Sequence, residues 1–245
     1  MRTLRFYVPL DLSEGGVIQA PDSTARHISQ VLRLRVEDEI ILFNGNDIEY
    51  SAQIVEIKKK SVLLKILDSK AVSKESEAKI HLIQAISKGD RMDWVIQKSV
   101  ELGVSSIQPV TSKRNNVKLS SDRLAKKILH WQGIVASACE QCGRNTLPDI
   151  YPVLDLSSAI ENLPIQHSTN RIILNPQSSK KLQSTEFKEK SFSLAVGPEG
   201  GFDENEIAYL ERMGFESYNL GSRILRTETA AISAIALLQA LHGDL

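Results

Sequence analysis

The chain has 245 residues, 42% of them hydrophobic and 24% charged, and its 30 basic residues balance its 30 acidic ones, which excludes a disordered polyelectrolyte. Two cysteines exclude a disulfide framework and favour a reducing compartment, and the most apolar stretch of the sequence is too short to span a bilayer. The first residues lack the apolar segment of a signal peptide, so we expect a soluble, cytoplasmic protein.

Residues 1–68 are predicted to form a small, mostly β domain. Branched and aromatic residues indicate strands at 5–8, 17–20, 39–43, 48–57 and 61–67. Asn44 and Gly45 predict a tight turn, because both tolerate a positive φ. One helix interrupts the strands, and Asp22 or Ser23 is its expected cap. The polar residues 69–79 have no hydrophobic periodicity and are the expected linker to a second domain.

From residue 80 onward the pattern alternates between strand and helix, which predicts an α/β domain with a mainly parallel sheet. The expected strands are 80–86, 106–110, 171–174, 192–196 and 215–220. The expected helices are 91–102, 121–142, about 204–214, and one that starts at Thr227 or Thr229.

The helix at 91–102 has a core face and a second face that carries Arg91, Trp94, Lys98 and Glu101. Such a stripe of cations, an aromatic ring and an acid can meet RNA. A solvated face with i, i+3 ion pairs is the more common origin of such a pattern.

The balanced total charge conceals a basic segment at 111–127. Residues 80–145 contain ten Lys or Arg and five Asp or Glu, and within 111–127 the acid is Asp122. A local patch on a neutral protein indicates a polyanion that docks at one place. A solvated loop followed by a charged helix face explains the pattern equally well. The basic residues of the segment are Lys113, Arg114, Lys118, Arg123, Lys126 and Lys127.

The most distinctive segment is a buried strand that runs into the glycine-rich turn GPEGG at 197–201. Asp203 and Glu206 predict a capping box that opens the next helix. Ligands of open α/β sheets bind at the carboxyl ends of strands, where this turn lies. The glycine spacing excludes a dinucleotide fingerprint and a P-loop. A ligand-binding turn and a purely structural strand–helix turn remain equally good explanations.

A second turn, at 220–229, follows the next strand. Arg223, Arg226 and Glu228 crowd there, near a helix N-terminus that favours negative charge. The alanines of that helix allow another backbone to come close, although helix propensity alone explains them.

Cys139 and Cys142 form a lone C-x-x-C late in a predicted helix. A structural zinc site needs two further ligands nearby, and the five histidines are scattered along the chain. A redox pair normally lies at the start of a helix. We therefore expect neither a metal site nor a redox function, and no Ser/His/Asp or Cys/His arrangement is recognisable.

Five motifs occur in an order that resembles a known family: KGDRM at 88–92, QKSVELGV at 97–104, EQCGR at 140–144, GPEGG at 197–201 and LGSRILRTETA at 220–230. With these motifs the chain is similar, over nearly its whole length, to the bacterial 16S ribosomal RNA (uracil-N3)-methyltransferases of the SPOUT superfamily. Residues 27–45 also resemble the PUA-like RNA-binding domain of that family.

The resemblance implies a PUA-like β-barrel at 1–68, a linker at 69–79 and a SPOUT methyltransferase domain at 80–245 with a C-terminal trefoil knot. It also implies S-adenosylmethionine as methyl donor, no metal, a homodimer, and 16S rRNA in the assembled small ribosomal subunit as substrate. General rules of chain topology alone reject a knot. The implied donor-binding residues are Leu174, Asn175, Gly197, Glu199, Gly200, Gly201, Leu220, Gly221, Ile224, Leu225 and Arg226.

The chemistry of the implied reaction suggests catalytic roles. The N3 proton of uracil titrates well above neutral pH, and a cation beside O2 or O4 lowers that pKa. Arg226 is the expected cation, and Glu199 or Glu228 is the expected proton acceptor.

We expect RNA to be bound through contacts between basic side chains and its phosphates. The expected RNA-binding residues are Arg91, Lys98, Lys113, Arg114, Lys118, Lys126 and Lys127.

Two alternative functions stay open: a SPOUT methyltransferase that acts on another RNA, such as tRNA, and a non-catalytic RNA-binding assembly factor.

Overall fold

The computed structural model describes residues 4–59, 61–114, 121–162 and 170–245. The chain divides into two compact units, one formed by Met1–Glu75 with Ala136–Leu147 and the other by Ser76–Val135 with Pro148–Leu245. The division after Glu75 lies inside the polar segment 69–79, although strand β5 (Val62–Ala71) extends into that segment. The sequence predicts that residues 136–147 are part of a second domain at 80–245, whereas in the structure they belong to the first unit.

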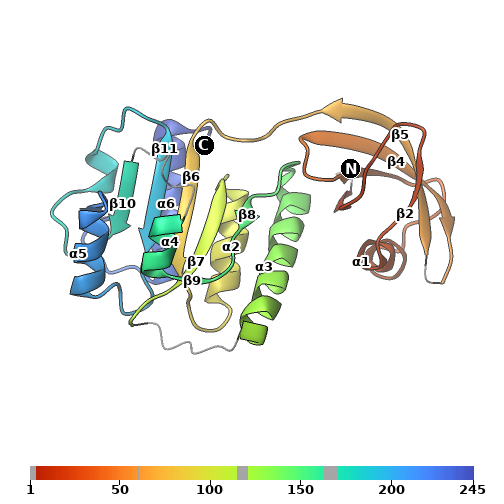
Figure 1. Cartoon of the computed structure of the whole chain (residues 1–245). Coiled ribbons are helices and arrows are strands. Elements are labelled where there is room, and N and C mark those ends of the chain that lie inside the picture. The colour runs from red at the N-terminus through yellow and green to blue at the C-terminus, as the bar shows by residue number, and fades with distance from the viewer. Residues whose placement is uncertain (1–3, 60, 115–120, 163–169) are drawn as a thin grey trace. The chain divides into compact units, whose positions relative to one another are not determined.

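The first unit is built on a five-stranded sheet in the order β1-β3-β4-β5-β2 (Figure 1). Strand β1 runs parallel to β3, and the other neighbours are antiparallel. Alternate side chains such as Ile54, Leu64 and Ile66 are fully buried, as the period of a strand requires. The strands are β1 (Arg5–Tyr7), β2 (Val17–Gln19), β3 (Glu39–Phe43), β4 (Ile48–Ile57) and β5.

The helix of this unit is shorter and less regular than its sequence predicts. Helix α1 (Asp22–Arg26) passes directly into a π-helical turn, η1 (His27–Val31). The expected cap at Asp22 or Ser23 is wrong, because Pro21 occupies the N-cap position and no side chain caps the helix. The Ser29 hydroxyl donates to the Ala25 carbonyl at 2.7 Å, a local bond of the kind that competes with regular helix geometry.

Residues 136–147 join the first unit through buried polar contacts. The backbone N–H of Tyr7 donates to Glu140 Oε1 at 2.9 Å, and Asn145 Nδ2 donates to the carbonyl of Val72 at 2.7 Å. Arg144, only 4% exposed, donates through Nε to Glu75 Oε1 at 2.8 Å. These bonds connect residues that are 69 to 133 positions apart, so local sequence patterns do not reveal them.

The second unit contains a seven-stranded parallel sheet, which confirms the predicted α/β class. The strand order is β12-β10-β11-β6-β7-β8, and β9 also pairs with β7. Strands β8 and β9 and helix α4 were not expected, because two-residue strands and a seven-residue helix leave almost no periodic signal. The strands are β6 (Lys79–Ala85), β7 (Ser106–Thr111), β8 (Asp149–Ile150), β9 (Leu154–Asp155), β10 (Asn170–Leu174), β11 (Ser191–Val196) and β12 (Glu216–Tyr218).

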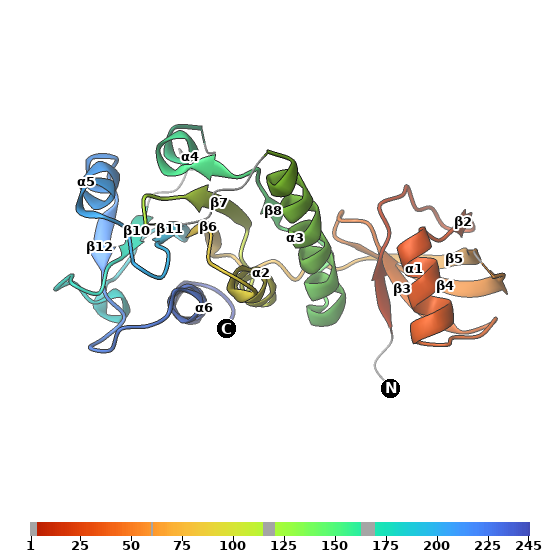
Figure 2. The same cartoon turned by 90° about the horizontal axis from the view of Figure 1, so that it is seen from below.

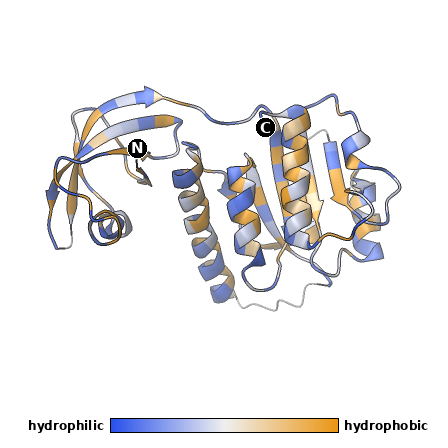
Figure 3. Cartoon of the chain, turned by 180° about the vertical axis from the view of Figure 1, so that it is seen from behind, coloured by the Kyte–Doolittle hydropathy of each residue, from blue (hydrophilic) through white to orange (hydrophobic). Residues whose placement is uncertain are grey.

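Helices cover both faces of this sheet (Figure 2). Helices α2 (Arg91–Glu101) and α6 (Thr227–His242) lie on one face, and α4 (Leu156–Asn162) and α5 (Glu204–Arg212) lie on the other. In Figure 3, α6 is coloured mostly hydrophobic, and its Ala231 and Ala234 are fully buried. A short 3-10 helix, η3 (Leu182–Ser184), lies between β10 and β11. Burial of β10 and β11 on both faces explains their continuous apolar runs.

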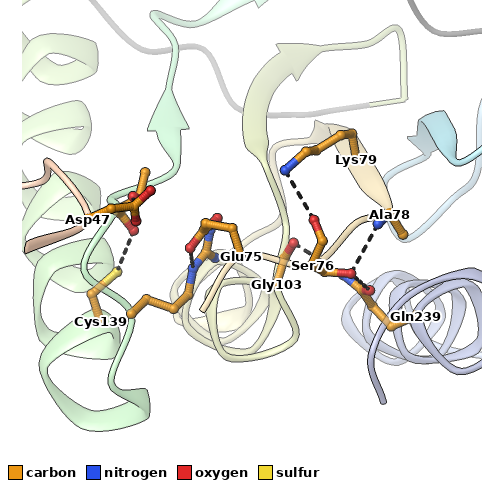
Figure 4. Close-up of polar contacts among 10 residues, drawn as sticks. Asp47, Glu75, Ser76, Ala78, Lys79, Gly103, Cys139 and Gln239 are labelled. Atoms are coloured by element: carbon orange, nitrogen blue, oxygen red, sulfur yellow. Dashed lines mark hydrogen bonds and ion pairs between the residues drawn. The ribbon is translucent and has the colours of Figure 1, made fainter. Parts of the chain in front are cut away.

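A buried glutamine ties the end of α6 to the start of the sheet (Figure 4). Gln239 Oε1 accepts from the Ser76 hydroxyl at 2.6 Å, and its Nε2 donates to the Gly103 carbonyl at 3.2 Å. Gln239 has no exposed surface. Because burial makes an unmatched polar group costly, these two bonds fix the helix end against β6 and the turn after α2.

Replacing Gln239 by alanine should lower the free energy of unfolding of the chain by about 2–3 kcal/mol, since Ser76 and Gly103 lose a buried partner. Urea unfolding followed by circular dichroism measures the change. Gln97→Ala is the matched control, because Gln97 is an exposed glutamine on α2. Equal stability of the two variants would contradict the role given to Gln239.

Among the residues that the structure describes, no helix combines the length and apolar character that crossing a membrane requires.

Candidate active site

A cavity of about 350 Å³ opens at the carboxyl ends of three neighbouring parallel strands, β10, β11 and β12. Its volume lies within the range of small-molecule sites. The walls are the three loops that follow these strands, together with the first turns of α5 and α6. The cavity therefore lies at the edge of the sheet where parallel α/β folds bind ligands.

Three segments that are distant in sequence meet around this cavity. All but one of the expected donor-binding residues line it, and the exception is Arg226. Arg226 is exposed at the N-cap of α6, between the lining residues Leu225 and Thr227. The lining residues expected from the sequence are Leu174, Asn175, Gly197, Glu199, Gly200, Gly201, Leu220, Gly221, Ile224 and Leu225.

The glycine-rich turn is tight enough to require glycine at two positions. A Cβ on Gly197 would lie 2.7 Å from the backbone nitrogen of Phe202, a distance that real structures do not tolerate. Gly201 has φ +68°, in the left-handed region that favours glycine. The predicted capping box follows at once: Asp203 accepts from the Glu206 N–H, and Glu206 accepts from the Asp203 N–H. The turn therefore lies between two fixed elements, strand β11 before it and the capped start of α5 after it.

A chain of buried hydrogen bonds lies behind the cavity. Thr227 Oγ1 donates to the Gly197 carbonyl at 2.7 Å and accepts from Gln84 Nε2 at 3.1 Å. Gln84 has no exposed surface and Thr227 only 5%. These bonds join the end of β6, the glycine-rich turn and the first residue of α6, so the walls of the cavity are fixed relative to one another.

An acidic pair shares one arginine at the rim. Glu199 Oε1 accepts from Arg91 Nη1 at 2.7 Å and from the Lys88 backbone N–H at 3.1 Å. Burial raises the pKa of Glu199, but the bonds from its own N–H, from Lys88 and from Arg91 outweigh burial and lower the pKa. Glu228 Oε1 lies 3.9 Å from Arg91 Nε, and its Oε2 is buried without a hydrogen-bond partner among the described residues.

The residues expected to bind RNA occupy several environments. Arg91 is held by Glu199, and Lys98 forms an i, i+3 ion pair with Glu101 at 2.8 Å. Lys126 is exposed on helix α3 (Ser121–Cys142), and Lys127 lies over the ring of Trp131, 5.4 Å from its centroid. Lys118 lies outside the described residues.

Lys113 and Arg114 lie against the glycine-rich turn. Lys113 Nζ is 3.2 Å from Asp203 Oδ2, and Arg114 Nη1 donates to the Gly200 carbonyl at 2.7 Å. Arg114 lines the cavity, a position that sequence reasoning missed because 86 residues separate it from Gly200. Other lining residues that it missed belong to the same strand ends, loops and helix starts as the expected ones, and their position beside the two turns was the available signal. They are Ile173, Pro176, Gln177, Val196, Pro198, Phe202, Glu204, Ile207, Tyr218, Asn219, Arg223, Thr227 and Ala230.

Cys139 is an inert buried thiol. Burial raises its pKa to about 12, so the reactive thiolate does not form at neutral pH. Within the described part of the chain, no group of three or more His, Cys, Asp or Glu side chains is arranged to hold a metal ion.

Comparison with known families gives two matches. Residues 74–239 match the RNA methyltransferase domain, and residues 20–67 match the RNA methyltransferase PUA domain. The ribosomal RNA small subunit methyltransferase E of Buchnera aphidicola subsp. Schizaphis graminum is 37% identical over 100% of this chain and 98% of its own length. The protein of that name from Bacillus subtilis is 28% identical, over 98% of this chain and 99% of its own length.

Two solved structures with bound S-adenosylmethionine share this fold. A putative methyltransferase from Legionella pneumophila superposes with a TM-score of 0.96 at 40% identity, and each chain is covered in full. Ribosomal RNA small subunit methyltransferase E from Neisseria gonorrhoeae superposes with a TM-score of 0.93 at 42% identity, with 99% of each chain covered. With an N-terminal PUA domain, a parallel-sheet methyltransferase domain and similarity along its whole length, the chain belongs to the ribosomal RNA small subunit methyltransferase E family.

Proposed function

We propose that the protein transfers a methyl group from S-adenosylmethionine to N3 of a uridine in 16S rRNA, and that its substrate is the assembled small ribosomal subunit. The observation that carries the proposal is the cavity at the ends of β10, β11 and β12, around which the glycine-rich turn and the turn at 220–225 meet.

The methyl donor binds in this cavity. Its adenosine part fits the apolar wall that Leu174, Val196 and Leu225 provide, and the exposed backbone of the glycine-rich turn supplies polar contacts. Methyl transfer needs the sulfonium carbon in line with the attacking nitrogen more than it needs covalent help. Positioning by the rigid walls therefore supplies most of the rate.

The target uridine lies beside the N-terminus of α6. Deprotonated uracil carries negative charge on N3, O2 and O4, and the Arg226 guanidinium and the positive end of the helix stabilise that charge. Arg226 is suited to this role because it is exposed and stands next to two lining residues rather than inside the cavity.

Glu228 is the better of the two candidate proton acceptors. Glu199 has a lowered pKa and already accepts from Arg91 and Lys88, so it is a weak base. Glu228 keeps one carboxylate oxygen without a hydrogen-bond partner among the described residues. A free acceptor oxygen two residues from Arg226 suits a group that takes the N3 proton while the arginine holds the anion.

A trefoil knot and a homodimer complete the proposal. In a knot, the chain after β12 passes through the loop that surrounds it. The close approach of Thr227 to the Gly197 carbonyl and the clash that a Cβ on Gly197 would cause are in keeping with such crowding. The exposed Trp94 on α2, with 59% of its surface accessible, suits an interface between two copies of the chain.

Gly197→Ala should abolish measurable donor binding, because the added methyl group meets the backbone of residue 202 and the turn must open. Isothermal titration with S-adenosylmethionine measures the affinity. Gly200→Ala is the matched control, since its Cβ would lie 3.4 Å from the flexible stem of Arg114 and should weaken binding far less. Similar losses in both variants would contradict a specific steric requirement at Gly197.

Arg226→Ala should lower turnover by about 100-fold and leave the donor Kd within about twofold, because the guanidinium acts on the uridine anion. Single-turnover methylation of small subunits that lack the modification, followed by mass spectrometry of the nucleosides, measures both the rate and the formation of 3-methyluridine. Full turnover in Arg226→Ala would remove the assignment of Arg226. A product other than 3-methyluridine would refute the proposed target atom.

Lys126→Ala should weaken binding to the small subunit and reduce the slope of log K against log salt by about one, as the loss of one phosphate contact requires. Filter binding over a range of salt concentrations gives the slope. Lys190→Ala is the control, since Lys190 is an exposed lysine paired with Glu77. An unchanged slope in Lys126→Ala would show that this part of α3 is only a solvated face.

A further inference from the structure

The basic segment begins on the wall of the cavity. Arg114 follows β7 by three residues, and its Nη1 donates to the Gly200 carbonyl at 2.7 Å. Its aliphatic stem packs on Gly200, where a Cβ would lie 3.4 Å from Arg114 Cδ and 3.5 Å from its Cβ. One bond and this packing hold the guanidinium beside the cavity before any ligand binds, and most of its N–H donors have no partner among the described residues.

The charge of Arg114 is not neutralised by the acids around it. The neighbouring Lys113 lies 3.2 Å from Asp203 through Nζ, and its backbone N–H donates to Glu206 Oε1 at 2.8 Å. Asp203 and Glu206 are therefore engaged by Lys113 and by each other's backbone N–H groups, whereas Glu204, also in the first turn of α5, lines the cavity. Among the residues that the structure describes, no carboxylate lies within 4.0 Å of the Arg114 guanidinium.

We propose that Arg114 binds the carboxylate of the methionine portion of the donor. The inference rests on the proposed function, because it requires S-adenosylmethionine in this cavity. That carboxylate is the one anionic group of the donor, and a fixed guanidinium with free N–H groups binds a carboxylate through two parallel bonds. Arg114 is thus a donor-binding residue instead of the RNA contact that its place in a basic segment predicts.

Arg223 is the other cation on the cavity wall, and it is the weaker candidate. Like Arg114 it is exposed, but it lies in the loop after β12 and has no bond that holds its guanidinium among the described residues. Ordering such a side chain costs conformational entropy on binding, whereas Arg114 has already lost that freedom. The geometry therefore favours Arg114.

The test compares two ligands that differ in the methionine portion. S-Adenosylhomocysteine carries the carboxylate, whereas 5′-methylthioadenosine retains the adenosine and the sulfur without it. Arg114→Ala should weaken S-adenosylhomocysteine by about 10- to 100-fold, the range of a hydrogen bond to a charged group, and change 5′-methylthioadenosine by less than about twofold. Isothermal titration of the full-length protein measures each Kd, and Arg114→Lys should restore part of the loss.

The outcomes separate this inference from the proposed function. Equal losses for both ligands in Arg114→Ala would mean that Arg114 only shapes the glycine-rich turn, which overturns the inference. A selective loss of S-adenosylhomocysteine in Arg223→Ala, with Arg114→Ala unaffected, would overturn it in favour of Arg223. Failure of the unmodified protein to bind either ligand would instead refute the proposed donor.

Discussion

The hydrogen bonds from Gln84 to Thr227 and from Thr227 to the Gly197 carbonyl connect the sheet to both ends of the candidate site. All three groups are buried, so none of them can exchange its partner for water. The bonds fix where α6 begins and how the glycine-rich turn leaves β11. The walls formed by the glycine-rich turn and by the start of α6 therefore keep a fixed separation.

Around these buried hydrogen bonds, the apolar surfaces of the site lie in its interior and the charged side chains lie at its rim. Strand ends and backbone form the interior, where uncharged surfaces suit an adenosine. Charged side chains stand at the rim and are paired with one another, as in Glu199 with Arg91 and Asp203 with Lys113. Backbone hydrogen bonds and this pairing lower the pKa of the Glu199 and Asp203 carboxyls and hold the side chains in place. Among the described residues, Glu228 Oε2 has no hydrogen-bond partner.

Local sequence patterns were sufficient for much of the fold and for the position of the glycine-rich turn, whereas the donor-binding residues were implied by the family resemblance. The capping box at Asp203 and Glu206 was predicted residue for residue, because helix ends have local chemical signals, and a helix was predicted over roughly 121–142, where α3 lies. The glycine-rich turn was predicted because its glycines and its proline directly follow an apolar strand.

The features that could not be predicted depend on contacts distant in sequence or on subtle backbone geometry. The π-helical turn at His27–Val31 differs from an α-helix in that its backbone hydrogen bonds span one residue more, which no periodicity in five residues can reveal. Arg114 and Arg91 read as solvated or RNA-facing charges until the fold brought them to Gly200 and Glu199, 86 and 108 positions away. Charge in a sequence is therefore a poor guide to which ligand a residue serves.

The membership of residues 136–147 in the first unit has a consequence for dissecting the molecule. A fragment that stops at Glu75 would keep all five strands of its sheet but lose Glu140, Arg144 and Asn145. It would leave the N–H of Tyr7, the carboxylate of Glu75 and the carbonyl of Val72 without their partners. Gene fusions or truncations that cut the chain at the linker would thus yield a PUA domain with unpaired polar groups on its surface, and one prone to associate with other chains.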